Sequence, residues 1–262
     1  MLQLKNLCKT FNRETPYEKT VYNGLNLSVE SGDFITLIGS NGAGKSTLFK
    51  LITNSLNLDE GSIVFDGKVI DKNEAFQTAR KVSSVVQDPK LGTVGGMTVF
   101  ENLAMADVKG KDPGLRFCLK KEKQGIYRNL LSQFDLGLED KLSIRTELLS
   151  GGQRQVLSLL MATMAVPKLL LLDEHTAALD PKTSEKVMSI TEALVRDHNL
   201  TCMMITHKLE DAIKYGNRLI MIHEGQVLFD IKGKEKECLD IKNLLSKFHS
   251  YKSSISDRQL FS

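Results

Sequence analysis

The glycine-rich segment Gly39-Ser-Asn-Gly-Ala-Gly-Lys-Ser-Thr47 constrains this chain more than any other part of its sequence. It fits the pattern G-x-x-x-x-G-K-[ST] and stands between a short apolar run and a stretch with helical spacing, the strand–loop–helix context that this pattern requires. Glycines let the backbone surround an anion with N–H groups, and the start of the following helix adds a partial positive charge. The segment therefore predicts a phosphate-binding loop; a glycine-rich turn without a ligand is the alternative.

The residue types in this loop predict individual roles around a bound nucleoside triphosphate. Lys45 is expected to reach the β- and γ-phosphates and to support catalysis, and the Ser46 hydroxyl is expected to ligate Mg²⁺. The expected nucleotide contacts of the loop are Gly39, Ser40, Asn41, Gly42, Ala43, Gly44, Lys45, Ser46 and Thr47.

Two carboxylates follow the most apolar strand that the sequence predicts. Residues 169–172 are four leucines, which suits a parallel strand covered on both faces. Asp173 comes at the end of that strand, where a phosphate-binding loop needs a carboxylate for its Mg²⁺. Glu174 follows directly, and a carboxylate there can polarise the water that attacks the γ-phosphate. Acids that only terminate a buried strand are the alternative, which the phosphate-binding loop disfavours.

A second anion site is predicted at residues 149–153, Leu-Ser-Gly-Gly-Gln, before a strongly apolar helical stretch. Ser150 is a good helix N-cap, and Gly151 and Gly152 leave backbone N–H groups open. One chain thus offers two phosphate-binding sites, although a bound ATP already fills the first. We expect Ser150, Gly151, Gly152 and Gln153 to complete a nucleotide site that belongs to another copy.

The pattern along the chain predicts an α/β body interrupted by a helical subdomain. Strands are expected at residues 2–7, 25–29, 34–38, 82–87, 169–173, 201–206, 218–222 and 226–230, with a hairpin at 61–69 and a helix at 45–54. Helical spacing and a higher Lys/Glu density mark residues 98–149 as the inserted subdomain. We expect one domain over residues 1–235, followed by a C-terminal helix and a flexible tail over 236–262.

Composition excludes several other classes of protein. The net charge of +3 is too small to indicate nucleic acid binding. Four cysteines lie scattered without CxxC spacing, which predicts reduced thiols in a cytosolic protein. The most apolar stretch is broken by Pro167-Lys168 and is shorter than the ~18 residues of a membrane span. No signal-peptide pattern begins the sequence. We therefore expect a soluble chain that reaches a membrane only by docking.

These motifs together resemble the nucleotide-binding subunits of ABC transporters, whose signature L-S-G-G-Q lies between the two Walker motifs. The resemblance covers about residues 2–230. It implies a P-loop NTPase core with a mostly parallel sheet, an N-terminal antiparallel β subdomain and an inserted helical subdomain. It also implies an ATPase that uses ATP and Mg²⁺, in which two subunits pack head to tail and each loop faces the partner's signature.

The resemblance implies further roles for single residues. Gln87 is similar to the glutamine that senses magnesium, His207 to the switch histidine at the γ-phosphate, and Asp180 to the aspartate that bridges the two sites. Phe11 resembles the aromatic residue that stacks on adenine, with Tyr17 or Tyr22 as alternatives. His175 stands where many members carry Pro; a solvent-facing or structural role for it is weighed against tuning of Glu174.

The resemblance also implies partners and a location. No span is fused, so we expect separate integral-membrane permease subunits and an extracytoplasmic solute-binding protein, with the chain on the inner face of the cell membrane. Strings such as Gln87-Asp88-Pro89 are similar to bacterial importer ATPases, and others to amino-acid uptake systems. Export, a soluble role in iron–sulfur assembly, and a non-identical ATPase partner remain as alternatives. The basic run at residues 120–123 suits a solvated helix face or a permease contact.

Overall fold

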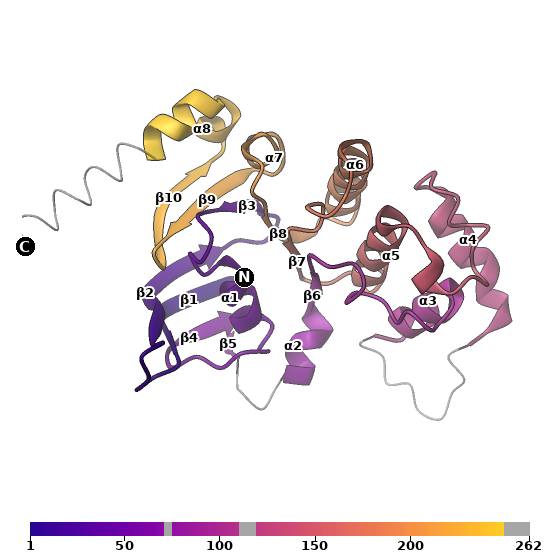
Figure 1. Ribbon diagram of the computed structural model, residues 1–262, viewed down its shortest axis with the longest axis horizontal. Helices are drawn as coiled ribbons and strands as arrows, with labels where there is room; N and C mark the ends of the chain where they lie inside the picture. The colour runs from indigo at the N-terminus through magenta and orange to yellow at the C-terminus, as the bar shows by residue number, and fades with distance from the viewer. Residues whose placement is uncertain (71–74, 110–118, 249–262) are drawn as a thin grey trace, which may run out of the picture. The chain divides into compact units, whose positions relative to one another are not determined.

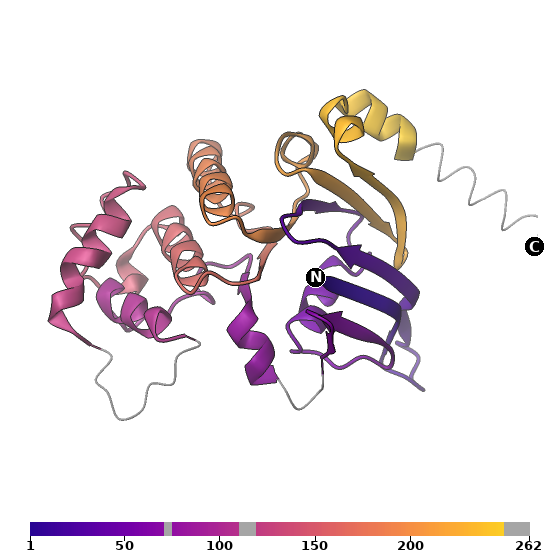
Figure 2. The ribbon, with the colours of Figure 1, turned by 180° about the vertical axis from the view of Figure 1, so that it is seen from behind.

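The computed structural model describes residues 1–70, 75–109 and 119–248 (Figures 1 and 2). The chain folds as two compact units. The first unit contains residues 1–52, 56–70 and the chain from 204 onward, and the second contains residues 53–55 and 71–203. Of the segment 236–262, predicted as a helix and a flexible tail, residues 249–262 lie outside the described residues.

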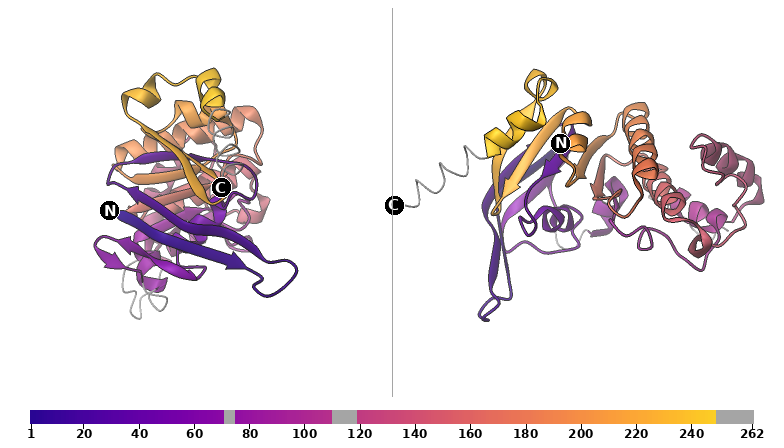
Figure 3. Two further views of the ribbon diagram at one scale, coloured as in Figure 1. Left: turned by 90° about the vertical axis from the view of Figure 1, so that its left-hand side faces the viewer. Right: turned by 45° about the horizontal axis from the view of Figure 1, so that its top comes forward.

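A four-stranded antiparallel sheet forms part of the first unit. Its order is β2 (Lys19–Val29), β1 (Leu2–Phe11), β4 (Glu60–Phe65) and β5 (Lys68–Val69), and Figure 3 shows β1, β2 and β4 side by side. β1 runs past its predicted end at Leu7. Its last residue, Phe11, pairs with Lys19, the first residue of β2. Register shifts on both sides of Leu7 interrupt the apolar–polar alternation, so the pattern stops before the strand does.

The strand before the phosphate-binding loop belongs to another group of strands in the first unit. β3 (Phe34–Ile38) pairs in parallel with β9 (Arg218–His223), and β9 pairs antiparallel with β10 (Gln226–Lys232). Every residue of β3 is buried, as expected for a strand covered on both faces. The helices of this unit are α1 (Lys45–Ile52), α7 (Leu209–Lys214), α8 (Lys234–Glu237) and the helical residues 241–248.

Arg218 joins three segments of the first unit, and we expect its loss to destabilise the fold strongly. Its buried guanidinium donates to Asp230 at 2.8 Å and 2.5 Å, to Asp33 Oδ2 at 2.8 Å and to the Ser28 carbonyl at 2.9 Å. Arg218→Met leaves two carboxylates without their cation, so the free energy of unfolding in urea is expected to fall by about 3–5 kcal/mol.

The matched control for this prediction is Arg196→Met. Arg196 is exposed and pairs only with its neighbour Asp197 at 3.0 Å among the contacts seen in the described residues. Its loss is expected to change the free energy of unfolding by less than about 1 kcal/mol. Equal effects of the two substitutions would contradict the role given to Arg218.

The second unit combines parallel strands with helices. β6 (Val82–Val85) pairs in parallel with β7 (Leu169–Asp173), and β8 (Thr201–Ile205) leads from this unit into the first. Its helices are α2 (Ala75–Lys81), α3 (Val99–Asp107), α4 (Gln124–Ser132), α5 (Gly151–Thr163) and α6 (Pro181–Asp197), with 3-10 turns η1 (Lys121–Lys123) and η2 (Thr146–Leu148).

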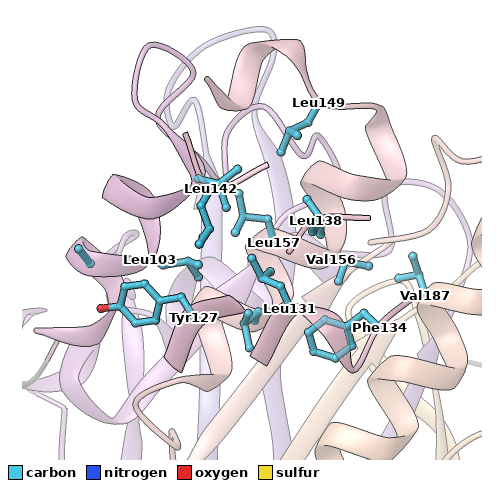
Figure 4. Close-up of a cluster of buried hydrophobic side chains, with 13 residues drawn as sticks. Leu103, Tyr127, Leu131, Phe134, Leu138, Leu142, Leu149, Val156, Leu157 and Val187 are labelled. Carbon is cyan, nitrogen blue, oxygen red and sulfur yellow. The ribbon is translucent and has the colours of Figure 1, made fainter. Parts of the chain in front are cut away.

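One hydrophobic cluster holds the helices of the second unit together. Figure 4 shows Leu103 of α3, Tyr127 and Leu131 of α4 and Leu157 of α5 converging in it. The helical spacing predicted over residues 98–149 corresponds to α3, α4 and the two 3-10 turns. Thr98 caps α3 through a reciprocal capping box with Glu101, which explains why this helix begins where it does.

The predicted α/β class, with its antiparallel N-terminal sheet, parallel strand pairs and helical insertion, is confirmed. No helix among the described residues is long and apolar enough to cross a membrane. Cys8, Cys202 and Cys238 are free thiols, as predicted, and Cys118 lies outside the described residues.

Candidate functional site

The phosphate-binding loop leaves β3 at Ile38 and ends where α1 begins at Lys45. Lys45 is buried, and its amine donates to the carbonyls of Gly39 at 2.8 Å and Ser40 at 3.0 Å, so the cation lies against the loop's own backbone. The start of α1 carries the partial positive charge of its helix dipole. A cation and a helix N-terminus therefore meet in this loop, which suits a phosphate group.

A second cation, which the sequence analysis missed, lies beside the same loop. The Lys19 amine is 3.3 Å from the position that a Cβ on Gly42 would take. Lys19 starts β2 and pairs with Phe11 across the β1–β2 ladder. The register of this ladder places Lys19 near the loop, and the sequence pattern did not predict that register.

The structure narrows the choice of an adenine-stacking residue. Tyr22 is only 1% exposed, and its hydroxyl donates to the Gly44 carbonyl at 2.6 Å. The interpretation of Tyr22 as a stacking residue is therefore wrong, because its ring faces the interior. Phe11 is half-buried at the end of β1, with the Lys9 amine 5.4 Å from its ring centre, and Tyr17 is 80% exposed. Phe11 and Tyr17 remain as candidates.

The two predicted acids stand at the end of β7 in the second unit. Asp173 is the last residue of the strand, and Glu174 follows it in a left-handed conformation with φ of 47°. A non-glycine residue rarely adopts such a conformation, and strain of this kind clusters at functional sites. The Gln87 amide donates to Glu174 Oε2 at 3.3 Å, so the structure brings two of the predicted residues together across 87 positions of sequence.

The predicted second anion site has the geometry of a capped helix start. Ser150 accepts a hydrogen bond from the Gln153 N–H at 3.3 Å, while its own N–H donates to the Gln153 side chain at 3.2 Å. This capping box leaves the N–H groups of Gly151 and Gly152 without partners inside α5. Ser150 and Gly151 are exposed, so this helix start is accessible.

Asp180 lies next to that helix start. It caps α6 by accepting from the Thr183 N–H at 3.1 Å, and hydrogen bonding to Thr183 lowers the pKa of its carboxyl. A Cβ on Gly152 would lie 2.3 Å from Thr183 Cγ2, so only glycine lets α5 and α6 approach this closely. The structure therefore brings the residues 150–153 and Asp180 into one neighbourhood.

His207 lies in the first unit, on the exposed turn after β8. Together with Thr206 and Gly39 it lines a cavity of about 190 Å³ that is closed on another side by Leu244 and Phe248 of the C-terminal helix. The predicted switch histidine is thus beside the first glycine of the phosphate-binding loop.

His175, the departure from the resemblance, is a buried residue. It is 2% exposed, and its Nε2 lies 3.0 Å from the Thr191 hydroxyl of α6. Burial lowers the pKa of the imidazole to about 4, so the ring is neutral near pH 7. The structural role weighed for His175 agrees with this packing, and the solvent-facing alternative is wrong because the ring is buried.

The predicted magnesium ligands fit the ion by their chemistry. Ser46, Gln87 and Asp173 offer a hydroxyl, an amide and a carboxylate oxygen, which are hard ligands of the kind that Mg²⁺ prefers. Gln87 uses its amide N–H₂ on Glu174, which leaves its oxygen as the atom suited to a cation. Among the described residues no group of three or more His, Cys, Asp or Glu side chains is placed so that it could hold a metal ion. Mg²⁺ sites commonly use only one or two carboxylates together with phosphate oxygens.

This chain is similar in sequence to known ATP-binding proteins of transporters. The family model described as "ABC transporter" matches residues 22–177. A tyrosine transport ATP-binding protein of Clostridioides difficile (strain R20291) is 46% identical over 248 residues, covering 95% of this chain and 98% of that protein. A phosphonates import ATP-binding protein of Treponema denticola is 32% identical over 237 residues, covering 88% of this chain and 89% of that protein.

A solved structure supports the same fold. A dimeric, post-hydrolysis ATP-binding cassette bound to ADP and Pi matches with a TM-score of 0.75 at 27% identity, covering 88% of this chain and 98% of that chain. This likeness confirms the P-loop NTPase core predicted from residues 39–47.

Proposed function

This chain belongs to the ABC transporter family, and from that premise we propose that it works as one half of a dimer that encloses two ATP molecules. The exposed helix start at Ser150 carries the proposal, because its free N–H groups form an anion site in a chain that already has a phosphate-binding loop. A head-to-tail partner supplies the nucleotide that this second site contacts. The solved cassette of similar fold is dimeric, which supports a dimer for this chain.

The family membership makes the chain an ATPase, and we propose how its residues divide the work. Residues 39–47 hold the phosphates; Ser46, Gln87 and Asp173 would hold Mg²⁺, which would supply positive charge to the phosphoryl group when bound. Glu174 takes a proton from the attacking water. His207 contacts the γ-phosphate, Phe11 stacks on adenine, and Asp180 with residues 150–153 completes the partner's site.

A groove in the second unit supports a permease as the partner that uses the energy of ATP hydrolysis. It has a volume of about 580 Å³ and is lined by Ser83, Met105, Lys109, Ser158 and Met161 among others. The Lys109 amine donates to Ser83 Oγ at 2.8 Å, and burial holds the pKa of this lysine below its ordinary value. A carboxylate on an inserted permease segment would compensate that desolvated charge. The chain then lies on the inner face of the membrane.

We propose a small solute such as an amino acid as the cargo. The relative named for tyrosine transport is 46% identical to this chain, whereas the phosphonate importer subunit is 32% identical. An ATPase subunit does not touch the cargo, so a permease and an extracytoplasmic solute-binding protein determine its identity.

Affinity purification from detergent-solubilised membranes tests the transport proposal. The tagged chain is expected to recover a polytopic permease, and Lys109→Glu is expected to reduce that recovery at least about fivefold, because like charges meet in the groove. Lys68→Glu, an exposed edge-strand control, is expected to leave recovery unchanged. Recovery of soluble iron–sulfur assembly proteins without a permease would contradict the proposal.

A further inference from the structure

We propose that Lys19 binds the phosphates of the nucleotide from the β2 side of the phosphate-binding loop, as a second cation besides Lys45. The proposal rests on the nucleotide-binding function proposed for residues 39–47 and for Phe11. It adds to that site a binding residue that comes from the antiparallel sheet, whereas the loop and α1 supply the residues that the sequence pattern predicted.

The start of β2 lies against the phosphate-binding loop at two points. A Cβ on Gly42 would lie 3.3 Å from the Lys19 amine, and a Cβ on Gly44 would lie 2.8 Å from Val21 Cγ1. Lys19 and Val21 therefore both face the loop. Gly42 has a φ of 82°, a conformation that favours glycine, and its lack of a side chain leaves the amine beside the loop's backbone.

The register of the β1–β2 ladder places the same lysine next to the predicted adenine contact. Phe11 and Lys19 are direct partners in the antiparallel pair. The neighbouring pair, Thr10 and Thr20, is joined by a hydrogen bond of 3.1 Å between the two hydroxyls. Directly opposed side chains leave the same face of the sheet, with Cβ atoms about 5 Å apart. A nucleotide that stacks on Phe11 and places its phosphates in the loop must therefore pass beside the Lys19 amine.

The charge of Lys19 is available to an anion. The residue is exposed, and no ion pair of its amine is present in the part of the chain that the structure describes. The adjacent acid, Glu18, is occupied within the hairpin, where it accepts the Glu14 N–H at 2.9 Å. Lys9 on the neighbouring strand differs, because its amine already pairs with Asp59 at 2.8 Å.

The exposure of Lys19 determines how its contribution should depend on salt. A lysine ammonium is a compact charge on a flexible stem, which suits phosphate oxygens without a fixed geometry. Dissolved ions screen an exposed pair of charges strongly and a buried pair much less. Lys19 is exposed and Lys45 is buried. The share of nucleotide affinity that comes from Lys19 should therefore shrink as the salt concentration rises.

Lys19→Met tests the proposal because it removes the charge and keeps most of the stem. We expect the dissociation constant for ADP with Mg²⁺, measured by titration calorimetry, to rise about fivefold in about 50 mM KCl and less than about twofold in about 500 mM KCl. Lys19→Arg keeps the charge and is expected to stay within about twofold of the unmodified chain. The matched control is Lys5→Met, because Lys5 is an exposed lysine of the same sheet that pairs with Ser62 and should not affect ADP affinity.

Three results would overturn the proposal. One is an ADP affinity of Lys19→Met within about twofold of the unmodified chain at the lower salt concentration. Another is a loss that does not shrink at the higher salt concentration, which would indicate a disturbed ladder instead of a lost charge. The third is an equal loss of affinity in Lys5→Met or in Lys19→Arg.

Lys45→Ala separates this inference from the proposed function. If Lys45→Ala loses ADP binding while Lys19→Met keeps the affinity of the unmodified chain, only the role of Lys19 fails. If Lys45→Ala binds ADP normally, residues 39–47 do not hold the nucleotide and both proposals fail.

Discussion

Replacing Glu174 with glutamine is expected to lower ATP hydrolysis by about 10²- to 10⁴-fold while ATP still binds. Glutamine has the same shape as glutamate but cannot take a proton from water. Gln87, which donates to Glu174 at 3.3 Å, can donate to the new amide oxygen instead, so the local contact survives. Phosphate release at saturating ATP and Mg²⁺ measures the loss. Glu192→Gln on α6, an exposed glutamate in the same unit, is the control and should retain full activity.

The same variant has a second expected property. Because ATP holds the two halves together and hydrolysis separates them, Glu174→Gln is expected to accumulate as a dimer in ATP and Mg²⁺. Light scattering should report twice the mass of the chain, and ADP in place of ATP should return the monomer. A variant that stays monomeric with ATP would contradict the proposed dimer.

Much of the fold was predictable where the determining interactions are local. Short apolar runs predicted β3 and β7, and the Asp66-Gly67 pair predicted the turn between β4 and β5. All three elements are present in the structure. The cap at Ser150 was also predictable, because its partner Gln153 is only three residues away. Such features depend on short stretches of chain and on propensities that a sequence displays directly.

Features that depend on distant segments were not predictable in the same way. The strand predicted for β1 ended too early, because register shifts with β2 disturb the apolar–polar alternation on which the prediction depended. Tyr22 was taken as a possible adenine contact because nothing near it in sequence reveals that Gly44, 22 positions away, takes its hydroxyl. Lys19 was overlooked for the same reason, since its position beside Gly42 follows from the ladder.

The candidate site shows the same division. Residues 39–47, Asp173 and Glu174 were predicted from local pattern and chemistry. Gln87, Asp180 and His207 were assigned through a family resemblance, because an isolated glutamine, aspartate or histidine at the end of an element has no distinctive local signal. The structure adds the contact of Gln87 with Glu174 and the cavity shared by His207 and Gly39.

Two single substitutions are expected to inactivate the enzyme by different routes. Lys45→Ala removes the buried cation that lies against Gly39 and Ser40, so the chain's own loop no longer holds ATP. Ser150→Arg places a bulky side chain at the exposed start of α5, so it blocks the nucleotide on the partner's loop. It also removes a helix cap, at a cost of about 1 kcal/mol, and its melting temperature must therefore be checked. Each variant alone is expected to lose ATPase activity at least about 100-fold.

Mixing the two inactive variants tests most directly whether the sites are shared between chains. In a two-fold symmetric dimer each site combines one chain's loop with the other chain's residues 150–153. A heterodimer of Lys45→Ala with Ser150→Arg then has one intact site and one doubly altered site. An equal mixture is expected to recover ATPase activity up to about a quarter of the unmodified level, since about half of the dimers are mixed and half of their sites are intact. A mixture no more active than its two components would contradict the shared site.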